Sequence, residues 1–438
     1  MSDLFVIGAG LSGLMAAYTA ARAGLRVQVV TKGLGSMHWA AGTVDVMGYT
    51  PEELSRPVQR PLEAIQALAH SHPEHPYVLL GSHQVQVALE EFTALMAELG
   101  LPYGGAGGFG ALAHSTSGDN LLLPSAVGAL RPAFLAPSAQ LAGDMARPEP
   151  LLIVGFTGLR DFYPELIAEN LAKQGFQARA AFLPLSLLTE QADRNNVHLA
   201  QALDLQARRL KLGGELKRLA RAGERIGLPA LLGLDDHAAA LADLSAAAGA
   251  PIFEIPTLPP SVPGMRLYKA LRARLWRMGV RIDVGLEGIG ANVIAANGTA
   301  GRVQWVETAT TTSRPLKHRA KAYLLATGGI LGGGFDSDHT GRIWETVFDL
   351  PLTIPQARHQ WFRPAFMDPA GHPVFNGGVA VNAAMQPVGA DGQVLYANLW
   401  AAGGALAGAD PIQQHSLEGL AIATGWAAGQ AIVRALAQ

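Results

Sequence analysis

The most restrictive feature of the sequence lies close to its start. A short apolar run at residues 4–7 and a second strand-like segment at residues 26–31 flank a helical stretch that begins near Leu14. Between the first run and the helix stand three glycines in the pattern G-x-G-x-x-G: Gly8, Gly10 and Gly13. Backbone N–H groups and a helix N-terminus can come close to a pyrophosphate only where side chains are absent. The spacing therefore predicts a strand–helix–strand unit that binds a dinucleotide.

Each glycine of this loop has its own expected task. Gly8 permits the tight turn, Gly10 lets the phosphates approach, and Gly13 lets the helix pack on the strand. The acidic residue that commonly binds a ribose at the end of the second strand is missing, and Thr31-Lys32-Gly33 stands there instead. Either this position does not contact a ribose, or hydroxyl and backbone groups replace the carboxylate.

The composition excludes several classes of protein. The 438 residues exceed one minimal core, so two or more domains are expected. The absence of cysteine excludes disulfides, thiolate-bound zinc and cysteine-ligated iron–sulfur clusters, so any further electron relay must belong to another polypeptide. A formal net charge of −2 argues against a nucleic-acid-binding surface. We expect no metal site.

Two segments imitate membrane signals. Residues 4–21 carry no charge and approach the length of a spanning helix, but glycines interrupt them and no basic residue precedes them. The apolar run from Gly419 to Val433 is broken by glycine and is too short to span a bilayer. We therefore expect a cytoplasmic protein without a membrane span of its own.

Hydrophobic patterning outlines the other elements. We expect strands at residues 151–155, 280–284, 288–295, 303–308, 322–327 and 394–400. We expect helices at 164–174, 198–249 (with breaks at Gly213-Gly214 and Gly227), 265–278 and from about Glu418 to the C-terminus.

Segments at both ends of the chain resemble the succinate dehydrogenase, fumarate reductase and L-aspartate oxidase group of flavoproteins. They are Thr31-Lys32, Gly35-Ser36 with Ala40-Ala41-Gly42, Ala326-Thr327-Gly328-Gly329 and Trp400-Ala401-Ala402-Gly403-Gly404. In that group Ser/Thr-Lys commonly replaces the ribose-binding acid, and the second segment lies beside the flavin. A histidine near this segment is bonded to the flavin in that group, but the spacing at His38 differs, so we expect a non-covalent flavin.

A closer resemblance is to the B-subunit family of anaerobic glycerol-3-phosphate dehydrogenases. It rests on residues 38–45, His75-Pro76-Tyr77, 154–162, Ala409-Asp410-Pro411-Ile412 and above all the proline-rich segment 256–267. It departs at residues 413–419. The family is commonly described with FMN for this polypeptide. A complete glycine loop suits a pyrophosphate, which FMN lacks, so we predict FAD, with FMN as the alternative.

The resemblance implies a fold and a domain division. We predict an α/β protein with a Rossmann-type FAD-binding domain, which is a parallel sheet with helices on both faces, and an inserted mixed α/β cap domain. We assign residues 1–50, 263–334 and 390–438 to the FAD-binding domain. Residues 51–262 form the inserted domain, and 335–389 form a second insertion near the substrate and the flavin.

The resemblance also implies an activity: oxidation of sn-glycerol 3-phosphate to dihydroxyacetone phosphate, with electrons passed to quinone. The implied partners are a second flavoprotein subunit and an iron–sulfur, membrane-associated subunit, which would hold the chain at the inner face of the membrane. Two alternatives stay open. The chain is a flavin-dependent dehydrogenase or oxidase of the fumarate reductase or L-aspartate oxidase type, or it is a non-catalytic flavin-carrying relay or assembly protein.

Three residues are candidates for catalysis. His38 could orient the flavin or accept the substrate hydroxyl proton, although a histidine packed near Trp39 is an equally good interpretation. Arg266 and Arg358 carry guanidinium groups suited to a phosphate, although most arginines form ion pairs or lie in solvent.

The N-terminus of the last helix is expected to point at the O2/N1 edge of the flavin. The expected cofactor contacts are Gly8, Gly10, Leu11, Ser12, Gly13, Thr31, Lys32, Gly33, Ser36, Gly42, Thr327, Gly328, Gly403, Asp410, Gly419 and Leu420.

Overall fold

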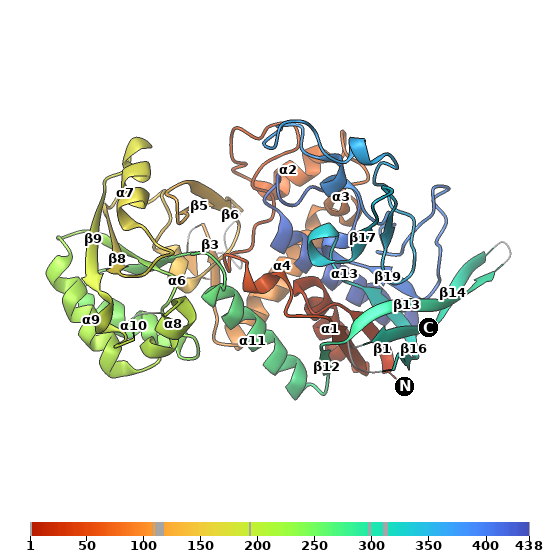
Figure 1. Ribbon diagram of the computed structural model, residues 1–438, viewed down its shortest axis with the longest axis horizontal. Coiled ribbons are helices and arrows are strands. Elements are labelled where there is room, and N and C mark those ends of the chain that lie inside the picture. The colour runs from red at the N-terminus through yellow and green to blue at the C-terminus, as the bar shows by residue number, and fades with distance from the viewer. Residues whose placement is uncertain are drawn as a thin grey trace. The chain divides into compact units, whose positions relative to one another are not determined.

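The structure is a computed structural model that describes residues 2–106, 108–109, 118–191, 194–296, 299–309 and 314–437 (Figure 1). The chain divides into two compact units. Unit 1 comprises Met1–Ser36, Asp45–Phe92 and Leu271–Gln438, and unit 2 comprises Met37–Val44 and Thr93–Ala270.

Unit 1 is built on a five-stranded parallel sheet in the order β12-β2-β1-β16-β19. Its strands are β1 (Ser2–Ile7), β2 (Val27–Thr31), β12 (Arg281–Val284), β16 (Ala320–Leu325) and β19 (Leu399–Ala401). The side chains of β1 from Leu4 to Ile7 are buried, as the apolar run predicts for a central parallel strand. The predicted fold class is confirmed in this unit.

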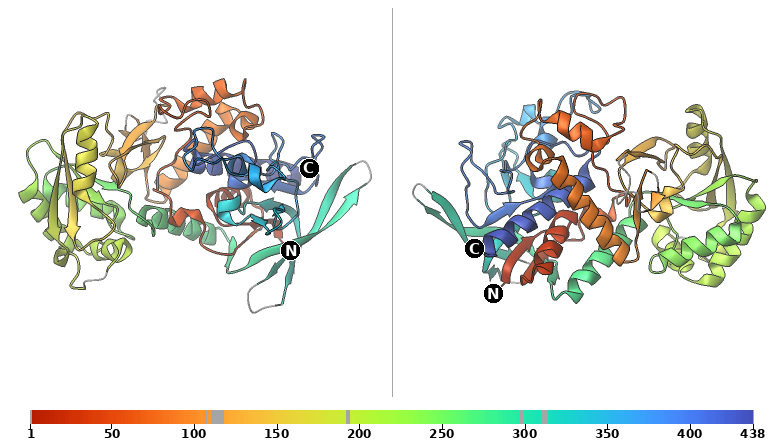
Figure 2. Two further views of the ribbon diagram at one scale, coloured as in Figure 1. Left: turned by 45° about the horizontal axis from the view of Figure 1, so that its top comes forward. Right: turned by 180° about the vertical axis from the view of Figure 1, so that it is seen from behind.

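The two faces of this sheet have different neighbours. On one face lie α1 (Leu11–Arg22) and α13 (Leu417–Ala437), which pack side by side (Figure 2). On the other face Phe5 stacks on His318 with ring centroids 4.7 Å apart. His318 belongs to an antiparallel sheet of β13 (Glu287–Ala296), β14 (Thr299–Ala309) and β15 (Leu316–His318). One detail therefore differs from the prediction, because this second face carries a sheet where helices were expected.

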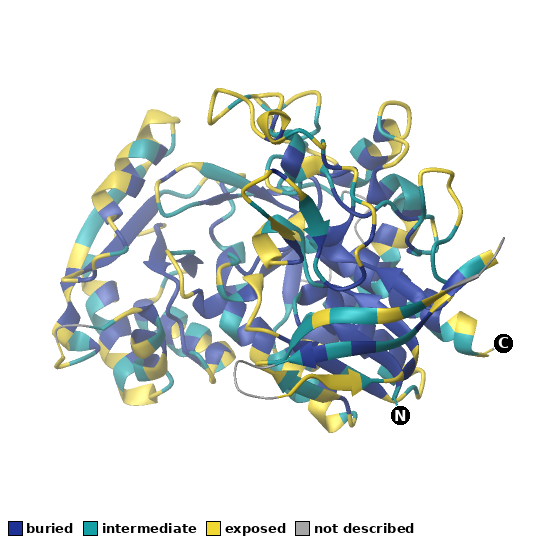
Figure 3. Ribbon diagram, turned by 45° about the vertical axis from the view of Figure 1, so that its right-hand side comes forward, coloured by how far each residue is buried: buried dark blue, intermediate teal, exposed yellow. Residues whose placement is uncertain are grey.

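The remaining elements of unit 1 are short, and most lie in loops that follow the strands. They are α2 (Pro61–Leu68), α3 (Pro76–Leu80), η3 (Ile330–Gly332), β17 (Phe335–Ser337), β18 (Ile343–Glu345), η4 (Arg358–Gln360), α12 (Pro373–Asn376) and η5 (Gly403–Ala405). Burial is concentrated in the parallel sheet and in α1 and α13, whereas the β13–β14 hairpin carries many exposed residues (Figure 3).

Unit 2 has its own parallel sheet, in the order β11-β10-β8-β9. Its strands are β8 (Leu151–Thr157), β9 (Ala178–Pro184), β10 (Arg225–Pro229) and β11 (Ile252–Ile255), and its helices are α7 (Pro164–Lys173), α8 (Asn196–Leu203), α9 (Gln206–Leu219) and α10 (His237–Ala248). Smaller elements are β3 (Tyr103–Gly105), β4 (Gly108–Phe109), β5 (Leu121–Pro124), β6 (Leu130–Ala133), β7 (Ala136–Pro137), α6 (Ser138–Leu141) and η2 (Leu185–Leu187). A separate apolar core, which includes Ile153, Leu212 and Phe253, supports this unit. The expected mixed α/β character is confirmed.

Two helices, α4 (Ser82–Glu98) and α11 (Val262–Arg277), contribute residues to both units. Short η1 (Ser36–His38) also lies at a boundary between them in the sequence. The expected domain boundaries differ from this division, because residues 51–92 belong to unit 1, whereas residues 37–44 and 263–270 belong to unit 2. A physical reason is visible at α3, where buried His75 is hydrogen-bonded to Gln414 just before α13.

The expected helical stretch 198–249 is wrong in detail. Helix α9 continues through Gly213. Glycine is needed at this position because a side chain would collide with Ala247 of α10. Residues 225–229 form the buried strand β10, and Gly227 makes room for the ring of Phe253. In both places glycine serves close packing and does not break the element. The expected strand 394–400 is also shorter, at Leu399–Ala401.

Helix α13 begins and ends within one residue of the bounds that the sequence predicted. Within the part of the chain that the structure describes, it alone is long and apolar enough to cross a membrane. However, 56% of its most apolar window is buried inside the protein. Gly425 and Gly429 bring it into contact with Ser12 and Thr19 of α1. These contacts are those of a core helix in a globular protein.

Candidate functional site

The turn between β1 and α1 is held by close backbone contacts. Gly8 has φ 113°, and a side chain there would overlap the carbonyl oxygen of Ala326. A side chain at Gly13 would overlap the carbonyl oxygen of Gly8. Both positions therefore require glycine for packing, as the sequence predicted for the turn and for the approach of helix to strand.

Gly10 is different, because its surroundings are open. A Cβ atom built there meets nothing within 4 Å, and Gly10 is the N-cap of α1 without a side-chain capping bond. The first turn of α1 (Leu11, Ser12, Gly13) thus presents its N-terminus to an uncovered space. Backbone donors and the positive end of the helix dipole suit a phosphate at this point. The loop fits the pyrophosphate of FAD.

The residues that follow β2 in the sequence include no acid, but a carboxylate from another segment lies nearby. The hydroxyl of Thr31 donates to the carbonyl oxygen of Gly33 at 2.7 Å, so it holds the turn. Lys32 Nζ lies 2.7 Å from a carboxylate oxygen of Glu287, at the start of β13. A carboxylate from a distant part of the chain therefore lies near the end of β2, where it is paired with Lys32. No local sequence signal could have identified Glu287.

The carboxyl ends of β16 and β19 meet beside the same loop. Thr327 and Gly328 follow β16, and Gly403 follows β19. A side chain at Gly403 would press on Ser12, and the amide of Gly403 donates to Thr424 Oγ1 at 2.9 Å. The structure thus brings the predicted residues of three separate segments together around the N-terminus of α1.

The backbone amides of Gly419 and Leu420, two predicted cofactor contacts at the start of α13, bind acceptors within the protein. The amide of Gly419 donates to the carbonyl of Asp45 at 3.0 Å, and that of Leu420 to Ser416 at 2.9 Å. Both amides are engaged inside the protein, so neither is available to donate to a ligand, and the expectation that the N-terminus of α13 points at the flavin edge stays a prediction. Gly419 is instead needed for packing, because a side chain there would collide with Tyr77.

Asp410 closes the turn before α13. Its carboxylate accepts hydrogen bonds from the amides of Ile412 and Gln413, at 3.2 and 3.1 Å. Burial raises the pKa of this carboxyl, which is only partly offset by those two bonds. Asp410 therefore shapes the loop 410–416, and its expected direct contact with the cofactor stays a prediction.

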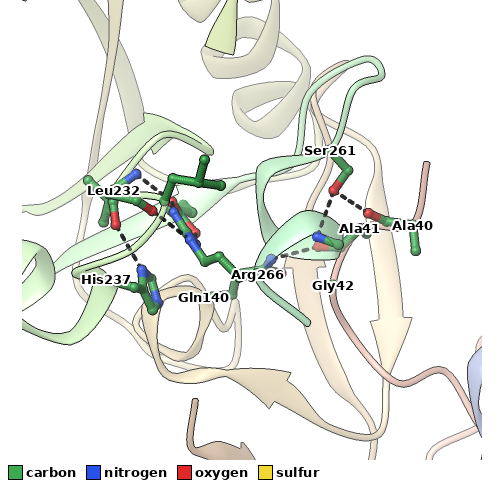
Figure 4. A network of polar contacts seen from close by, with 12 residues as sticks. Ala40, Ala41, Gly42, Gln140, Leu232, His237, Ser261 and Arg266 are labelled. Atoms are coloured by element: carbon green, nitrogen blue, oxygen red, sulfur yellow. Dashed lines mark hydrogen bonds and ion pairs between the residues drawn. The ribbon is translucent and has the colours of Figure 1, made fainter. Parts of the chain in front are cut away.

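The segment around His38 lies against the proline-rich segment, with both in unit 2. The carbonyl of His38 accepts from the amide of Ser261 at 2.7 Å, and its ring meets Tyr268 edge-on at 5.1 Å. Figure 4 shows Ser261 reaching Ala40 in the same segment. These contacts favour the packing role of His38, and its proton-accepting role stays a prediction. Ser36 is exposed in η1.

Gly42 is buried beside the start of α11. Its φ is 84°, a side chain would overlap Pro263, and its carbonyl accepts from the hydroxyl of Tyr103 at 2.6 Å. The two motifs that carry the closer family resemblance, residues 38–45 and 256–267, thus depend on each other for packing. This explains their joint presence in the sequence.

Arg266 does not present its guanidinium to a ligand. It is buried and forms a two-pronged ion pair with Glu254, both N···O distances being 2.8 Å, while Nε donates to the carbonyl of Gly233 at 2.7 Å (Figure 4). The neighbouring Glu254 carboxylate also accepts from the amide of Leu232. This geometry contradicts the expected contact of Arg266 with a substrate phosphate.

Arg358 remains available. It lies exposed in η4, with its guanidinium 5.8 Å from the centre of the Trp361 ring. Of the two arginines that were candidates for a phosphate, it is the one whose charge is open to solvent.

Comparison with known proteins decides the family. Residues 3–420 match the model of the FAD binding domain family. A Halobacterium salinarum protein, named as the B subunit of a probable anaerobic glycerol-3-phosphate dehydrogenase, is 34% identical over 99% of this chain and 98% of its own length. This chain belongs to that B-subunit family.

Two further relatives agree. The B subunit of the anaerobic glycerol-3-phosphate dehydrogenase of Yersinia pseudotuberculosis is 32% identical over 99% of both chains. That of Vibrio cholerae is 28% identical over 100% of this chain and 97% of its own. The predicted family is confirmed, and so is the prediction that FAD is the cofactor.

Proposed function

We propose that this chain is the FAD-binding subunit of a quinone-linked glycerol-3-phosphate dehydrogenase. The observation that carries the proposal is the conjunction of the open helix N-terminus at Gly10 with the full-length match to the B-subunit proteins. FAD would supply the oxidising power, because its flavin ring takes up two electrons from the carbon that bears the hydroxyl group.

The residues of this chain would supply binding and orientation. The loop Gly8–Gly13 would hold the pyrophosphate, and Gly328 and Gly403 would let the cofactor approach the carboxyl ends of β16 and β19. Arg358 would be available to a substrate phosphate, since an arginine fork pairs with phosphate in two-pronged fashion. Residues 335–389 would form the insertion that carries it.

We further propose that the chain works with a second flavoprotein subunit and with a cysteine-rich iron–sulfur subunit. The names of the relatives, each of which designates one subunit of an enzyme, support a complex. The absence of cysteine from this sequence supports placing any cluster in another polypeptide.

The test is an anaerobic titration of the purified yellow protein. Glycerol 3-phosphate should bleach the flavin absorbance, whereas glycerol, succinate and L-aspartate should not. Acid precipitation beforehand should release all colour as FAD, because the flavin is expected to be non-covalent. Bleaching by succinate or L-aspartate would favour the dicarboxylate or amino-acid alternative. Bleaching that requires another polypeptide would favour the relay alternative.

A further inference from the structure

The direction in which FAD extends can be deduced from unit 1. The pyrophosphate belongs at the N-terminus of α1, and the adenosine half belongs over the end of β2. In the sheet order, β16 and β19 lie on the opposite side of β1 from β2. The flavin half must therefore extend over the ends of β16 and β19, past Gly328 and Gly403.

Helix α13 begins beyond this same point. Gly425 touches Ser12 at the N-terminus of α1, and Gly429 touches Thr19, so the two helices run in the same direction. Leu417, at the start of α13, precedes Gly425 by eight positions, which is about 12 Å at 1.5 Å per residue. The residues just before α13 therefore lie past the pyrophosphate, on the side of the flavin half.

His415, two residues before α13, has an unusual backbone. Its φ is 47°, in the left-handed region that residues with a Cβ atom rarely adopt. Such a conformation costs free energy and persists only where the surroundings enforce it, which occurs most often at functional sites.

The surroundings of His415 do enforce it. The side chain of the preceding Gln414 is hydrogen-bonded to buried His75, with Nε2 and Oε1 3.1 Å apart. The carbonyl of Gln414 accepts from the amides of Gly48 and Tyr49, at 2.8 and 3.0 Å. The ring of Tyr49 meets the His415 ring edge-on, with centroids 5.2 Å apart. The backbone before His415 is thus anchored, and its ring contacts Tyr49 while the residue remains partly exposed.

We propose that His415 faces the flavin half of FAD and accepts the hydroxyl proton of the substrate. The second part rests on the proposed function. In the oxidation, the O–H bond breaks and its proton passes to the neutral imidazole. The hydrogen on the same carbon leaves with its electron pair to the oxidised flavin, and the C–O bond becomes a carbonyl. This assigns to His415 the role that the sequence suggested for His38.

Replacement by glycine separates function from structure. His415→Gly relieves the left-handed backbone, so the variant should bind FAD fully and melt at or above the wild-type temperature. Reduction of its flavin by glycerol 3-phosphate should nevertheless slow by about 100-fold or more. His415→Asn, which tolerates the same φ, should behave alike. The matched control is Asp349→Gly, because Asp349 also has a positive φ of 52°. That variant should likewise bind FAD fully and melt at or above the wild-type temperature. The control for loss of an imidazole is His198→Asn, because His198 is exposed on α8, and it should reduce at the wild-type rate.

Several results would overturn the assignment. Wild-type rates in both His415 variants would remove the catalytic role. Failure of both variants to fold or to hold FAD would show that His415 is a structural residue. If only the glycine variant failed, the asparagine variant would decide.

A substrate-free measurement tests the location of His415. An indole beside the flavin quenches its fluorescence, so His415→Trp should emit much less than wild type, whereas His415→Leu, which lacks an indole, should not. Absence of quenching would overturn the placement. If quenching occurs but glycerol 3-phosphate fails to bleach the wild-type flavin, the proposed substrate is wrong and the placement stands. If bleaching occurs without quenching, the substrate stands and the placement fails.

Discussion

Gly10 and Gly13 stand in the same loop, yet a side chain would meet opposite surroundings at the two positions. Gly10→Val should leave the apoprotein as stable as wild type, because the new atoms enter open space, but should abolish FAD binding by filling the place of the phosphates. Gly13→Ala should destabilise the apoprotein by about 1–3 kcal/mol through overlap with Gly8. Urea unfolding and flavin content per protein measure both effects. A full complement of FAD in Gly10→Val would contradict the assignment of the loop Gly8–Gly13 to the pyrophosphate.

Arg266 and Arg358 also differ in their surroundings, because the first is buried in an ion pair and the second is exposed. Arg266→Ala should cost about 3–5 kcal/mol of the free energy of unfolding, because it leaves the buried carboxylate of Glu254 without its partner. Arg358→Ala should change it by less than about 0.5 kcal/mol, because that side chain is exposed. Chemical denaturation of the two variants makes the comparison. An Arg266→Ala variant of unchanged stability that no longer binds glycerol 3-phosphate would restore the role expected from the sequence.

Residue roles were predictable only where the backbone itself determines them. The glycines of the nucleotide loop could be predicted, because tight turns and close approaches require the absence of a side chain. The role of Arg266 could not, because its partner Glu254 lies on a different element and the sequence does not show that both are buried together. The acceptor of the Gly419 amide, the carbonyl of Asp45, could not be predicted either, because it is remote in sequence.

At the scale of elements, continuous apolar runs were reliable guides. Strands β1, β8 and β16 were predicted from such runs, since a central parallel strand is buried on both faces. Helices α2 and α3 were missed because they are short and lie among prolines and polar residues. Helix α4 was also missed, although its buried apolar residues follow helical spacing: Val85, Ala88, Leu89, Phe92, Leu95 and Met96. Glycines inside α9 and β10 were interpreted as breaks, although tertiary packing uses them for close contact.

The link between α3 and the loop before α13 predicts a dependence of stability on pH. His75 Nδ1 accepts from the amide of Tyr77, which leaves Nε2–H to donate to Gln414, so the buried ring must be neutral. Burial lowers its pKa to about 4, against about 6.5 for a histidine in the unfolded chain. Below pH 6.5 the unfolded state therefore binds a proton that the folded state excludes.

The free energy of unfolding should consequently fall as the pH drops from about 6.5 to about 4, by roughly 3 kcal/mol from this group alone. His75→Gln removes the titrating ring while keeping a polar side chain. Its free energy of unfolding, measured by urea at several pH values, should depend on pH less steeply than that of wild type. The difference in slope between the two proteins should correspond to the uptake of close to one proton on unfolding. Buried His237, whose pKa is also lowered by burial, contributes equally to both proteins. Identical slopes would show that His75 is not the group concerned.

For the molecule as a whole, the sequence predicted the class of fold and the family, because the motifs lie at both ends and in the middle of the chain. It did not predict where the compact units divide. Residues 51–92 were placed with the inserted domain, yet they pack in unit 1 through polar contacts such as that of His75 with Gln414, which join positions far apart in sequence. Such boundaries depend on long-range contacts that no local pattern encodes.

The last prediction concerns the path of the electrons out of this chain. Without cysteine the chain cannot ligate an iron–sulfur cluster by thiolates, so under the proposed function the reduced flavin would pass its electrons to a cluster held by another polypeptide. The isolated chain should therefore reduce soluble dyes poorly, and should support glycerol-3-phosphate:quinone reduction only with a second flavoprotein and a cysteine-rich partner. The assay compares this chain alone, with each partner singly, and with both. Full quinone reduction by the chain alone would refute the partner model, and full activity of the partners without it would show that this chain is dispensable.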